Sequence, residues 1–184
     1  MKRIRIFISL LAAFALLAGL CALPAAAADT SGYAAEVLRL VNAERKKAGL
    51  AEVAAGSPSL YSAARKRAEE IAVKFDHKRP DGSTCFTVLD DYNVSYVAGG
   101  ENIAAGYATP AAVMEGWMAS PGHKANILGN YESLGVGVYV KDGRLYWSQM
   151  FIRKGSVAQS RWAAWPAWLR QLVRVLFFGW LWMR

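Results

Sequence analysis

Apolar and polar positions follow a helical period soon after residue 29. Over residues 33–48, apolar side chains recur every three or four positions and form one stripe. Gly49 follows this stripe, and glycine is the residue that most often ends a helix. Thr30 and Ser31 each have the hydroxyl that can cap a first turn. The pattern therefore predicts a helix over residues 33–48 that buries one face.

A second helix is predicted to begin at Ser57 and Pro58. Serine caps a first turn, and the fixed φ of proline suits the position that follows the cap. The buried face of this helix is expected to consist of apolar residues at helical spacing, namely Leu60, Ala64, Ala68, Ile71 and Phe75. In this interpretation the C-terminal end of the helix carries His77.

The pairing of a hydroxyl residue with proline recurs twice later in the chain. Thr109-Pro110 predicts the start of a third helix, and Ser120-Pro121 predicts a short helical segment. The hydroxyl of Ser120 is interpreted first as a helix cap. Residues 84–96, which precede these helices, have no clear period.

Strands are predicted in the second half of the domain. A short strand is expected around residues 101–105, and two β-type runs, 134–140 and 144–151, flank Asp142-Gly143. An Asp-Gly pair between two apolar runs is a strong hairpin signal. Helices first, a hairpin last and one strand between them predict an α+β domain built in layers.

The first 28 residues have the pattern of a secretory signal. Basic residues are followed by an apolar stretch over residues 6–20, and small residues end the segment at 26–28. We expect cleavage before Asp29 and an extracytoplasmic mature protein, secreted or periplasmic. An uncleaved anchor helix is the alternative, because the apolar run is nearly long enough to span a bilayer. Lipid modification at Cys21 is disfavoured because Leu20 precedes it.

The last part of the chain, residues 154–184, is a basic tail rich in tryptophan. Five of the seven Trp residues lie at or after residue 162, and Arg170 and Arg174 interrupt the apolar positions. Arginines are costly inside a membrane span, whereas Arg, Trp and Leu together suit an amphipathic helix at an anionic membrane surface. Two alternatives stay open, namely a helix that folds back onto the domain and a short membrane span.

Charge and cysteine content narrow the class of protein. Residues 29–152 contain 13 of the 22 Lys and Arg residues and all 14 Asp and Glu residues, so this part is near neutral. A near-neutral domain gives no support for nucleic-acid binding. Removal of the signal would leave Cys85 as the single cysteine, which excludes an intramolecular disulfide and suggests a bacterial protein held by its core. Cys85 is interpreted as a small packing residue.

Two long motifs resemble the CAP superfamily, which includes cysteine-rich secretory proteins, antigen 5 and plant pathogenesis-related proteins. The first is Gly-Glu-Asn-Ile-Ala-Ala-Gly at 100–106, and the second is Gly-Trp-Met-Ala-Ser-Pro-Gly-His-Lys-Ala-Asn-Ile-Leu at 116–128. Three shorter motifs follow the family's order at 41–45, 75–83 and 134–147. The resemblance covers residues 33–151 and is closest to the bacterial SCP-like extracellular branch.

The resemblance implies an α-β-α sandwich with a small antiparallel sheet between helical layers, over residues 29–153. It also implies a cleft in which His77, Glu101 and His123 occupy the matching positions, with Asn102 and Ser120 beside them. The family's second glutamate would fall about one helical turn after Trp117, where this chain has Ser120. The resemblance therefore leaves the metal site without one of its usual ligands.

The chemistry of this cleft admits several functions. Two imidazoles and a carboxylate can bind Zn²⁺, so His77, Glu101 and His123 are the expected metal ligands. The resemblance favours a binding module for a small apolar or amphipathic envelope ligand or a divalent metal. A metal-dependent hydrolase acting on peptide or cell-wall material is the alternative, although no nucleophile or oxyanion motif supports an enzyme. A membrane-tethered interaction protein with an incidental cleft is the third possibility.

Overall fold

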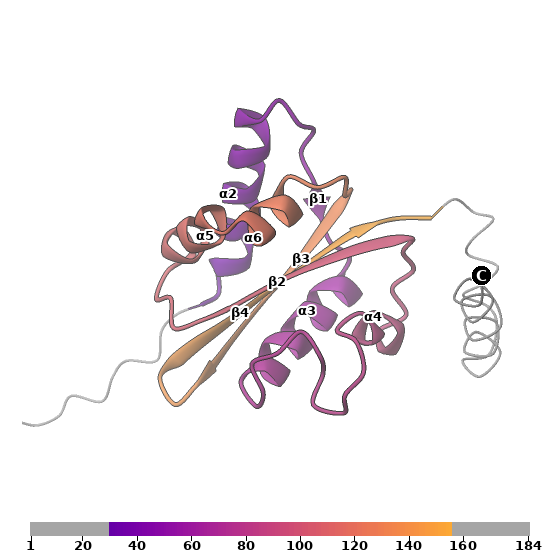
Figure 1. The fold of residues 1–184 in the computed structure, drawn as a ribbon, viewed down its shortest axis with the longest axis vertical. Helices are drawn as coiled ribbons and strands as arrows, with labels where there is room; N and C mark the ends of the chain where they lie inside the picture. Colours follow the sequence, from indigo (N-terminus) through magenta and orange to yellow (C-terminus); the bar gives the residue numbers. More distant parts are fainter. Residues whose placement is uncertain (1–29, 156–184) are drawn as a thin grey trace, which may run out of the picture.

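A four-stranded sheet forms the middle layer of the fold, between two layers of helices (Figure 1). The computed structural model describes residues 30–155. On one face of the sheet lie α2 (Tyr33–Lys47), α5 (Pro110–Ala119) and α6 (Pro121–Ile127). On the other face lie α3 (Pro58–Ile71) and α4 (Thr87–Asp91). The predicted α-β-α sandwich is confirmed.

The sheet has the strand order β1-β3-β4-β2. A hairpin joins β3 (Ser133–Lys141) to β4 (Arg144–Arg153), and its turn residues Asp142 and Gly143 have φ values of 51° and 73°. Such a turn needs two positive φ values, which Asp-Gly supplies at low cost. β2 (Ala98–Ala105) runs antiparallel to β4 at one edge. β1 (Ala54–Ala55) pairs in parallel with β3. The sheet is therefore mixed, whereas a purely antiparallel sheet was predicted.

Side chains of β4 alternate between two apolar cores because successive residues of a strand point to opposite faces. Trp147 and Phe151 belong to the core under α2 and α5, whereas Met150 and Ile152 belong to the core under α3 and α4. On the second face α3 packs very close to β3. A Cβ at Gly137 would overlap the backbone of Ala64, so glycine is what permits this approach.

Several boundaries differ from the sequence predictions. The cap of α2 is Gly32, which makes no side-chain hydrogen bond, and not Thr30 or Ser31. α3 is capped by Ser57 as predicted but ends at Ile71, so Phe75 is 57% exposed and is not part of the buried face. α4 and β1 were not predicted at all.

The signal segment and the tryptophan-rich tail lie outside the described residues. Within residues 30–155, no helix is both long and apolar enough to cross a membrane. Cleavage before Asp29 and the behaviour of residues 156–184 therefore stay predictions.

Candidate functional site

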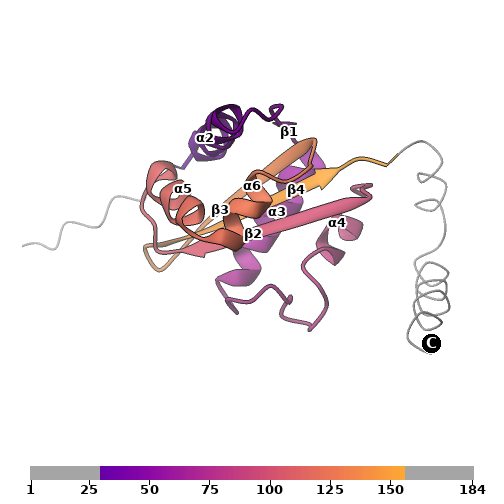
Figure 2. The ribbon, with the colours of Figure 1, turned by 45° about the horizontal axis from the view of Figure 1, so that its top comes forward.

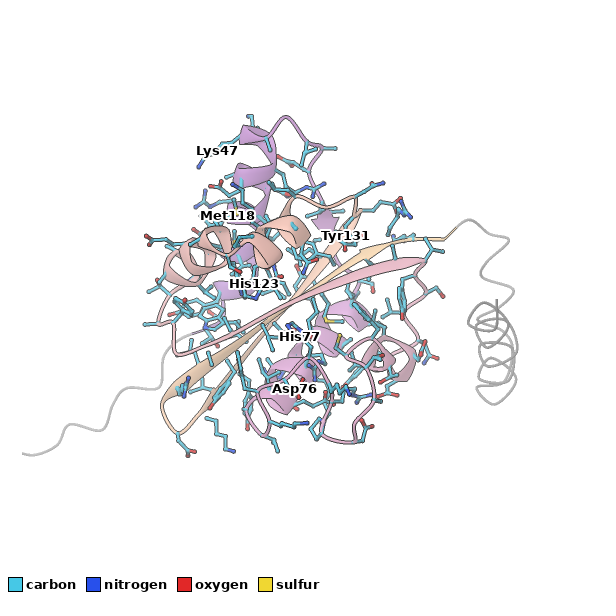
Figure 3. The ribbon with its side chains drawn as sticks, viewed as in Figure 1. Lys47, Asp76, His77, Met118, His123 and Tyr131 are labelled. Carbon is cyan, nitrogen blue, oxygen red and sulfur yellow. The ribbon has the colours of Figure 1, made fainter. Side chains whose placement is uncertain are left out.

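A cleft of about 600 Å³ opens where the end of β2 meets α5, α6 and the loop that follows α3. His77 and His123 lie on opposite sides of β2 in this region (Figure 3). Ser120 also contributes to the wall, whereas Glu101 and Asn102 lie behind it, in β2. The cleft is lined by Phe75, Asp76, His77, Ile103, Ala104, Ala105, Tyr107, Gly116, Trp117, Ser120 and His123.

Glu101 orients the imidazole of His77. The side chain of Glu101 is 2% exposed and points to the α3 face, where its Oε2 lies 2.7 Å from Nδ1 of His77. A carboxylate accepts a hydrogen bond from Nδ1–H, which leaves Nε2 of the neutral ring as an acceptor. The hydrogen bond to Glu101 raises the pKa of His77, and burial opposes this rise. The His77 side chain is 59% exposed, so Nε2 is available to a ligand.

Arg67 neutralises Glu101 from inside the domain. Its side chain is fully buried, and its Nε donates to Oε1 of Glu101 at 2.7 Å. Its Nη2 donates to the carbonyl oxygen of Asp76 at 3.0 Å, which ties down the residue beside His77. Burial lowers the pKa of Arg67, but the hydrogen bonds and charges of Glu101 and Glu70 outweigh it and raise that pKa. The guanidinium therefore stays charged and holds both partners.

The same network continues away from the cleft into α4. Nη1 of Arg67 donates to Oε2 of Glu70 at 2.7 Å, and Nη2 of Arg79 donates to Oε1 of Glu70 at 2.7 Å. Arg79 also pairs with Asp91 at 2.8 Å. These bonds connect α3, the loop that carries His77, and α4. They position His77 from several directions at once.

Cys85 lies in the same buried region and is a packing residue, as predicted. It is a free, buried thiol. Burial raises the pKa of Cys85 to about 12, and the neighbouring charge of Glu101 adds to the rise. A thiol with so high a pKa has almost no thiolate near neutral pH and is a poor nucleophile.

His123 is positioned by an amide network between β2 and α6. Nδ2 of Asn102 donates to the carbonyl oxygen of His123 at 3.1 Å and to Oε1 of Gln149 at 2.9 Å. Nδ2 of Asn126 donates in turn to Oδ1 of Asn102 at 2.9 Å. Burial lowers the pKa of His123, and the neighbouring His77 lowers it further. Asn102 is thus a residue that positions the cleft wall and lies behind it.

Ser120 does not cap α6 through its side chain, contrary to the sequence prediction. It is the residue between α5 and α6, and its backbone serves both helices. Its N–H donates to the carbonyl of Trp117 and its carbonyl accepts from the N–H of Lys124. Because no cap bond holds the hydroxyl, Ser120 contributes it to the cleft wall.

The donor set does not fit a divalent metal. Both carboxylate oxygens of Glu101 are already engaged, one by the cationic Arg67 and one by His77. Glu115, the one acidic residue of α5, is exposed and is not part of the cleft wall. Among residues 30–155, no group of three or more His, Cys, Asp or Glu side chains could hold a metal ion. Of the expected set, His77 and Glu101 form a hydrogen-bonded pair, and His123 lines the same cleft as His77.

The buried ion network was missed from the sequence, although a signal was present. Arg67 and Glu70 are three residues apart on α3, a spacing that brings side chains into contact on a helix. Arg67 lies within the apolar stripe beside Ala64 and Ala68, where a charged residue is unexpected unless it is paired. An arginine in the buried stripe of a helix is therefore a sign of a buried partner.

Comparisons with known proteins identify the family of this chain. A family model described as the cysteine-rich secretory protein family, CAP, matches residues 38–151. The uncharacterized protein YkwD of Bacillus subtilis is 39% identical over 132 residues, which is 70% of this chain and 50% of YkwD. The uncharacterized membrane protein YlbC of the same organism is 33% identical over 122 residues, which is 65% of this chain and 34% of YlbC. The chain thus spans half or less of these relatives.

Solved structures show the same fold. An extracellular protein with an SCP domain from Bacillus anthracis has a TM-score of 0.62 and 31% identity, over 67% of this chain and 41% of that chain. An outer surface protein of Borrelia burgdorferi has a TM-score of 0.61 and 20% identity, over 70% of this chain and 97% of that chain. Because the family model matches well over half of it, the chain belongs to the cysteine-rich secretory protein (CAP) family.

Proposed function

We propose that this CAP domain is an extracytoplasmic binding module whose cleft takes a small amphipathic ligand without a divalent metal. The observation that carries the proposal is an exposed imidazole, that of His77, held by a buried carboxylate at an otherwise largely apolar cleft. Ligand sites commonly combine apolar walls with a few oriented polar groups, in volumes of about 300–1,000 Å³. The cleft has both properties.

The walls offer both apolar surface and hydrogen-bonding groups to an amphipathic ligand. Phe75 and Tyr107 are large aromatic side chains that stay 57% and 38% exposed at the cleft. His77, His123 and Ser120 supply hydrogen-bonding groups. Exposed aromatic surface is costly in water, so burial against a ligand offers a gain of about 25 cal/mol per Å² of apolar area.

Export supports this role. Residues 1–28 have the pattern of a signal peptide, and the Bacillus anthracis neighbour is described as an extracellular protein. A ligand of the cell envelope would meet the cleft there.

Binding of the amphipathic dye ANS tests the proposal. Phe75→Ala should weaken dye binding by about five- to tenfold, because part of a buried aromatic contact is lost. The control is Leu50→Ala, which removes an apolar side chain that is 39% exposed and is absent from the cleft wall. Equal affinity of the two variants would contradict a ligand site in the cleft.

A hydrolase is the second candidate, because a carboxylate that orients an imidazole is also the arrangement of a general base. The His77–Glu101 pair has this arrangement. A zinc titration by calorimetry, followed by a peptide-hydrolysis assay, separates the readings. We expect that the protein does not bind zinc stoichiometrically. We also expect that His77→Ala does not change peptide hydrolysis. Zinc binding lost in both His77→Ala and His123→Ala, with hydrolysis, would favour the metal-dependent enzyme instead.

A further inference from the structure

The cleft follows the free edge of the sheet. β2 is the last strand in the order β1-β3-β4-β2, so one side of it has no neighbouring strand among the described residues. Figure 2 shows β2 at the margin of the sheet, with α6 on one face and α4 on the other. The end of this strand, Ile103 to Ala105, lines the cleft. A strand edge, and not only side chains, is therefore presented to a ligand.

The direction of each backbone group on β2 follows from its pairing with β4. Ala105 lies opposite Tyr146, and the N–H of Gly106 donates to the carbonyl of Leu145. Antiparallel pairs alternate, so the backbone groups of even-numbered residues point to β4 and those of odd-numbered residues point to the free edge. Gly99, Glu101, Ile103 and Ala105 therefore direct their N–H and C=O groups outward.

Side chains from the helical layer already bind the carbonyl groups along most of this edge. Tyr131 Oη donates to the carbonyl of Gly99 at 3.3 Å, and Asn126 Nδ2 donates to that of Glu101 at 2.9 Å. Trp117 Nε1 donates to the carbonyl of Ile103 at 3.4 Å, which is a long and weak bond. These bonds confirm the alternation that the register implies.

The edge is incomplete where it enters the cleft. Within residues 30–155, no protein group bonds the outward N–H of Ile103 or either outward backbone group of Ala105. Ile103 is 5% exposed. Backbone polar groups in such surroundings are nearly always paired, because an unpaired one costs free energy comparable to a lost hydrogen bond.

We propose that the ligand of the cleft is an extended peptide segment that adds to the edge of β2 as a further antiparallel strand. This inference rests on the proposed function and names the class of its ligand. The donors of Ile103 and Ala105 lie two residues apart, which is about 7 Å along a strand. A compact ligand with a single head group reaches only one end of this span. A peptide backbone offers an acceptor and a donor at every second residue, which matches the spacing.

The walls of the cleft suit the side chains of such a peptide. Successive side chains of an added strand point to opposite faces of the sheet. His77 and His123 lie on opposite sides of β2 (Figure 3), so each would meet side chains on one face of the added strand. Phe75 and Tyr107 also line the cleft. A Cβ at Gly116 would collide with the Tyr107 ring, so glycine lets that ring lie against α5. An apolar side chain with a polar neighbour completes the amphipathic ligand of the proposed function.

The test uses peptides whose backbone donors are removed one at a time. Capped pentapeptides, randomised at every position, are passed over the immobilised protein, and the retained sequences are resynthesised. Each is then N-methylated at single positions, and binding is measured by fluorescence anisotropy. Methylation of the peptide N–H that faces the free carbonyl of Ala105 should weaken binding by about tenfold or more. Methylation of the N–H groups on either side of it, which point away from β2, should have little effect. Dependence on one N–H and not on its neighbours is the signature of strand addition.

Variants of the protein give the reciprocal test. Ala105→Pro removes the outward N–H of an edge strand, where proline is tolerated, and should weaken the same peptides by about tenfold. Leu50→Ala, at a residue outside the cleft wall, should bind the same peptides like the original protein. Thermal unfolding checks that both variants are folded. The N-methylated peptides test the proposal on the unaltered protein even if Ala105→Pro does not fold.

Three results would overturn the proposal. One is the absence of any retained pentapeptide, and another is equal sensitivity to N-methylation at neighbouring positions. The third is a native mass of two chains that Ala105→Pro reduces to one, which would assign the edge to a second copy. If ANS still binds through Phe75 while no peptide is retained, the proposed function stands and only the peptide inference fails. If neither binds, both fail.

Discussion

Arg67 is the residue on which the geometry of the cleft depends most. It is fully buried and joins Glu101, Glu70 and the backbone of Asp76. Removal of one partner from a buried ion pair leaves an uncompensated charge, which typically costs about 3–5 kcal/mol. We therefore expect Arg67→Met to lower the free energy of unfolding by about 3–5 kcal/mol.

Urea denaturation measures this change, and α2 offers a matched control. Arg39→Met removes an arginine whose pair with Glu36 is exposed, at 64% and 42% for the two side chains. Exposed pairs contribute under about 1 kcal/mol. A similar loss in both variants would show that Arg67 does not hold the buried network.

His77 and Glu101 make the stability of the domain depend on pH. The hydrogen bond to Glu101 raises the pKa of His77 in the folded state above its value in the unfolded chain. A pKa that is higher in the folded state stabilises the fold, because the folded domain binds the proton more tightly. This stabilisation is complete below the pKa of the unfolded chain, near 6.5. It is lost as the pH rises through the pKa of His77 in the folded domain. His77→Gln should therefore lose stability relative to the original protein at low pH, and the difference should shrink as pH rises.

Urea midpoints of the two proteins at a series of pH values measure this difference. His123 acts in the opposite sense, because burial lowers its pKa and its protonation at low pH opposes folding. The comparison retains His123 in both proteins, so its direct contribution largely cancels. A difference that grows with rising pH would contradict the pairing.

Residue identities were predicted better than residue environments. Of the residues that the sequence motifs singled out, His77 and His123 line one cleft, and Glu101 lies behind it and bonds His77. They did not reveal that Arg67 already occupies one side of Glu101, since that contact joins residues 34 apart in the chain. Neither oxygen of Glu101 is therefore free of a partner, and the predicted metal site stays a prediction. Partners that meet only through the fold are not encoded in local spacing.

At the scale of elements, the packing of α3 on β3 depends on glycine. A Cβ at Gly137 would overlap the backbone at Ala64 and Arg65, which cannot move as a flexible side chain could. Gly137→Ala should force the helix from the sheet and destabilise the domain by roughly 1–3 kcal/mol. Thermal unfolding measures this change.

α6 supplies the control for this prediction. A Cβ at Gly122 would have no heavy atom within 4 Å, and alanine favours a helix over glycine. Gly122→Ala is therefore expected to be neutral or to stabilise by about 0.5–1 kcal/mol. Equal unfolding temperatures of Gly137→Ala and Gly122→Ala would contradict the prediction, because they would mean that α3 can pack on β3 without glycine at position 137.

Elements with local signals were predicted, and those set by distant contacts were not. Ser57 and Thr109 cap α3 and α5 through hydrogen bonds three residues ahead, so sequence alone identified both starts. α3 ends at Ile71 although no residue there breaks a helix. Arg67 binds the carbonyl of Asp76, which the chain can reach only by turning back after the helix. β1 has two residues and depends on pairing with β3, so no periodic pattern predicts it.

At the scale of the whole molecule, the near-neutral domain contrasts with the basic, tryptophan-rich tail. Four arginines and five tryptophans lie between residues 161 and 184. Each basic residue near an anionic bilayer contributes about 1 kcal/mol, and tryptophan favours the headgroup level. We expect the mature protein to sediment with phosphatidylglycerol-containing vesicles and much less with neutral ones.

Truncation after Lys154 isolates the contribution of the tail. The shortened protein retains every described helix and strand, so it should fold and stay in the supernatant. Added salt should release the full-length protein if its arginines hold it by charge, because screening weakens exposed attraction. Retention that resists salt would favour a tail inserted among the lipid chains. Equal sedimentation of the two proteins would mean that the tail does not bind membranes, and would leave packing against the domain as its role.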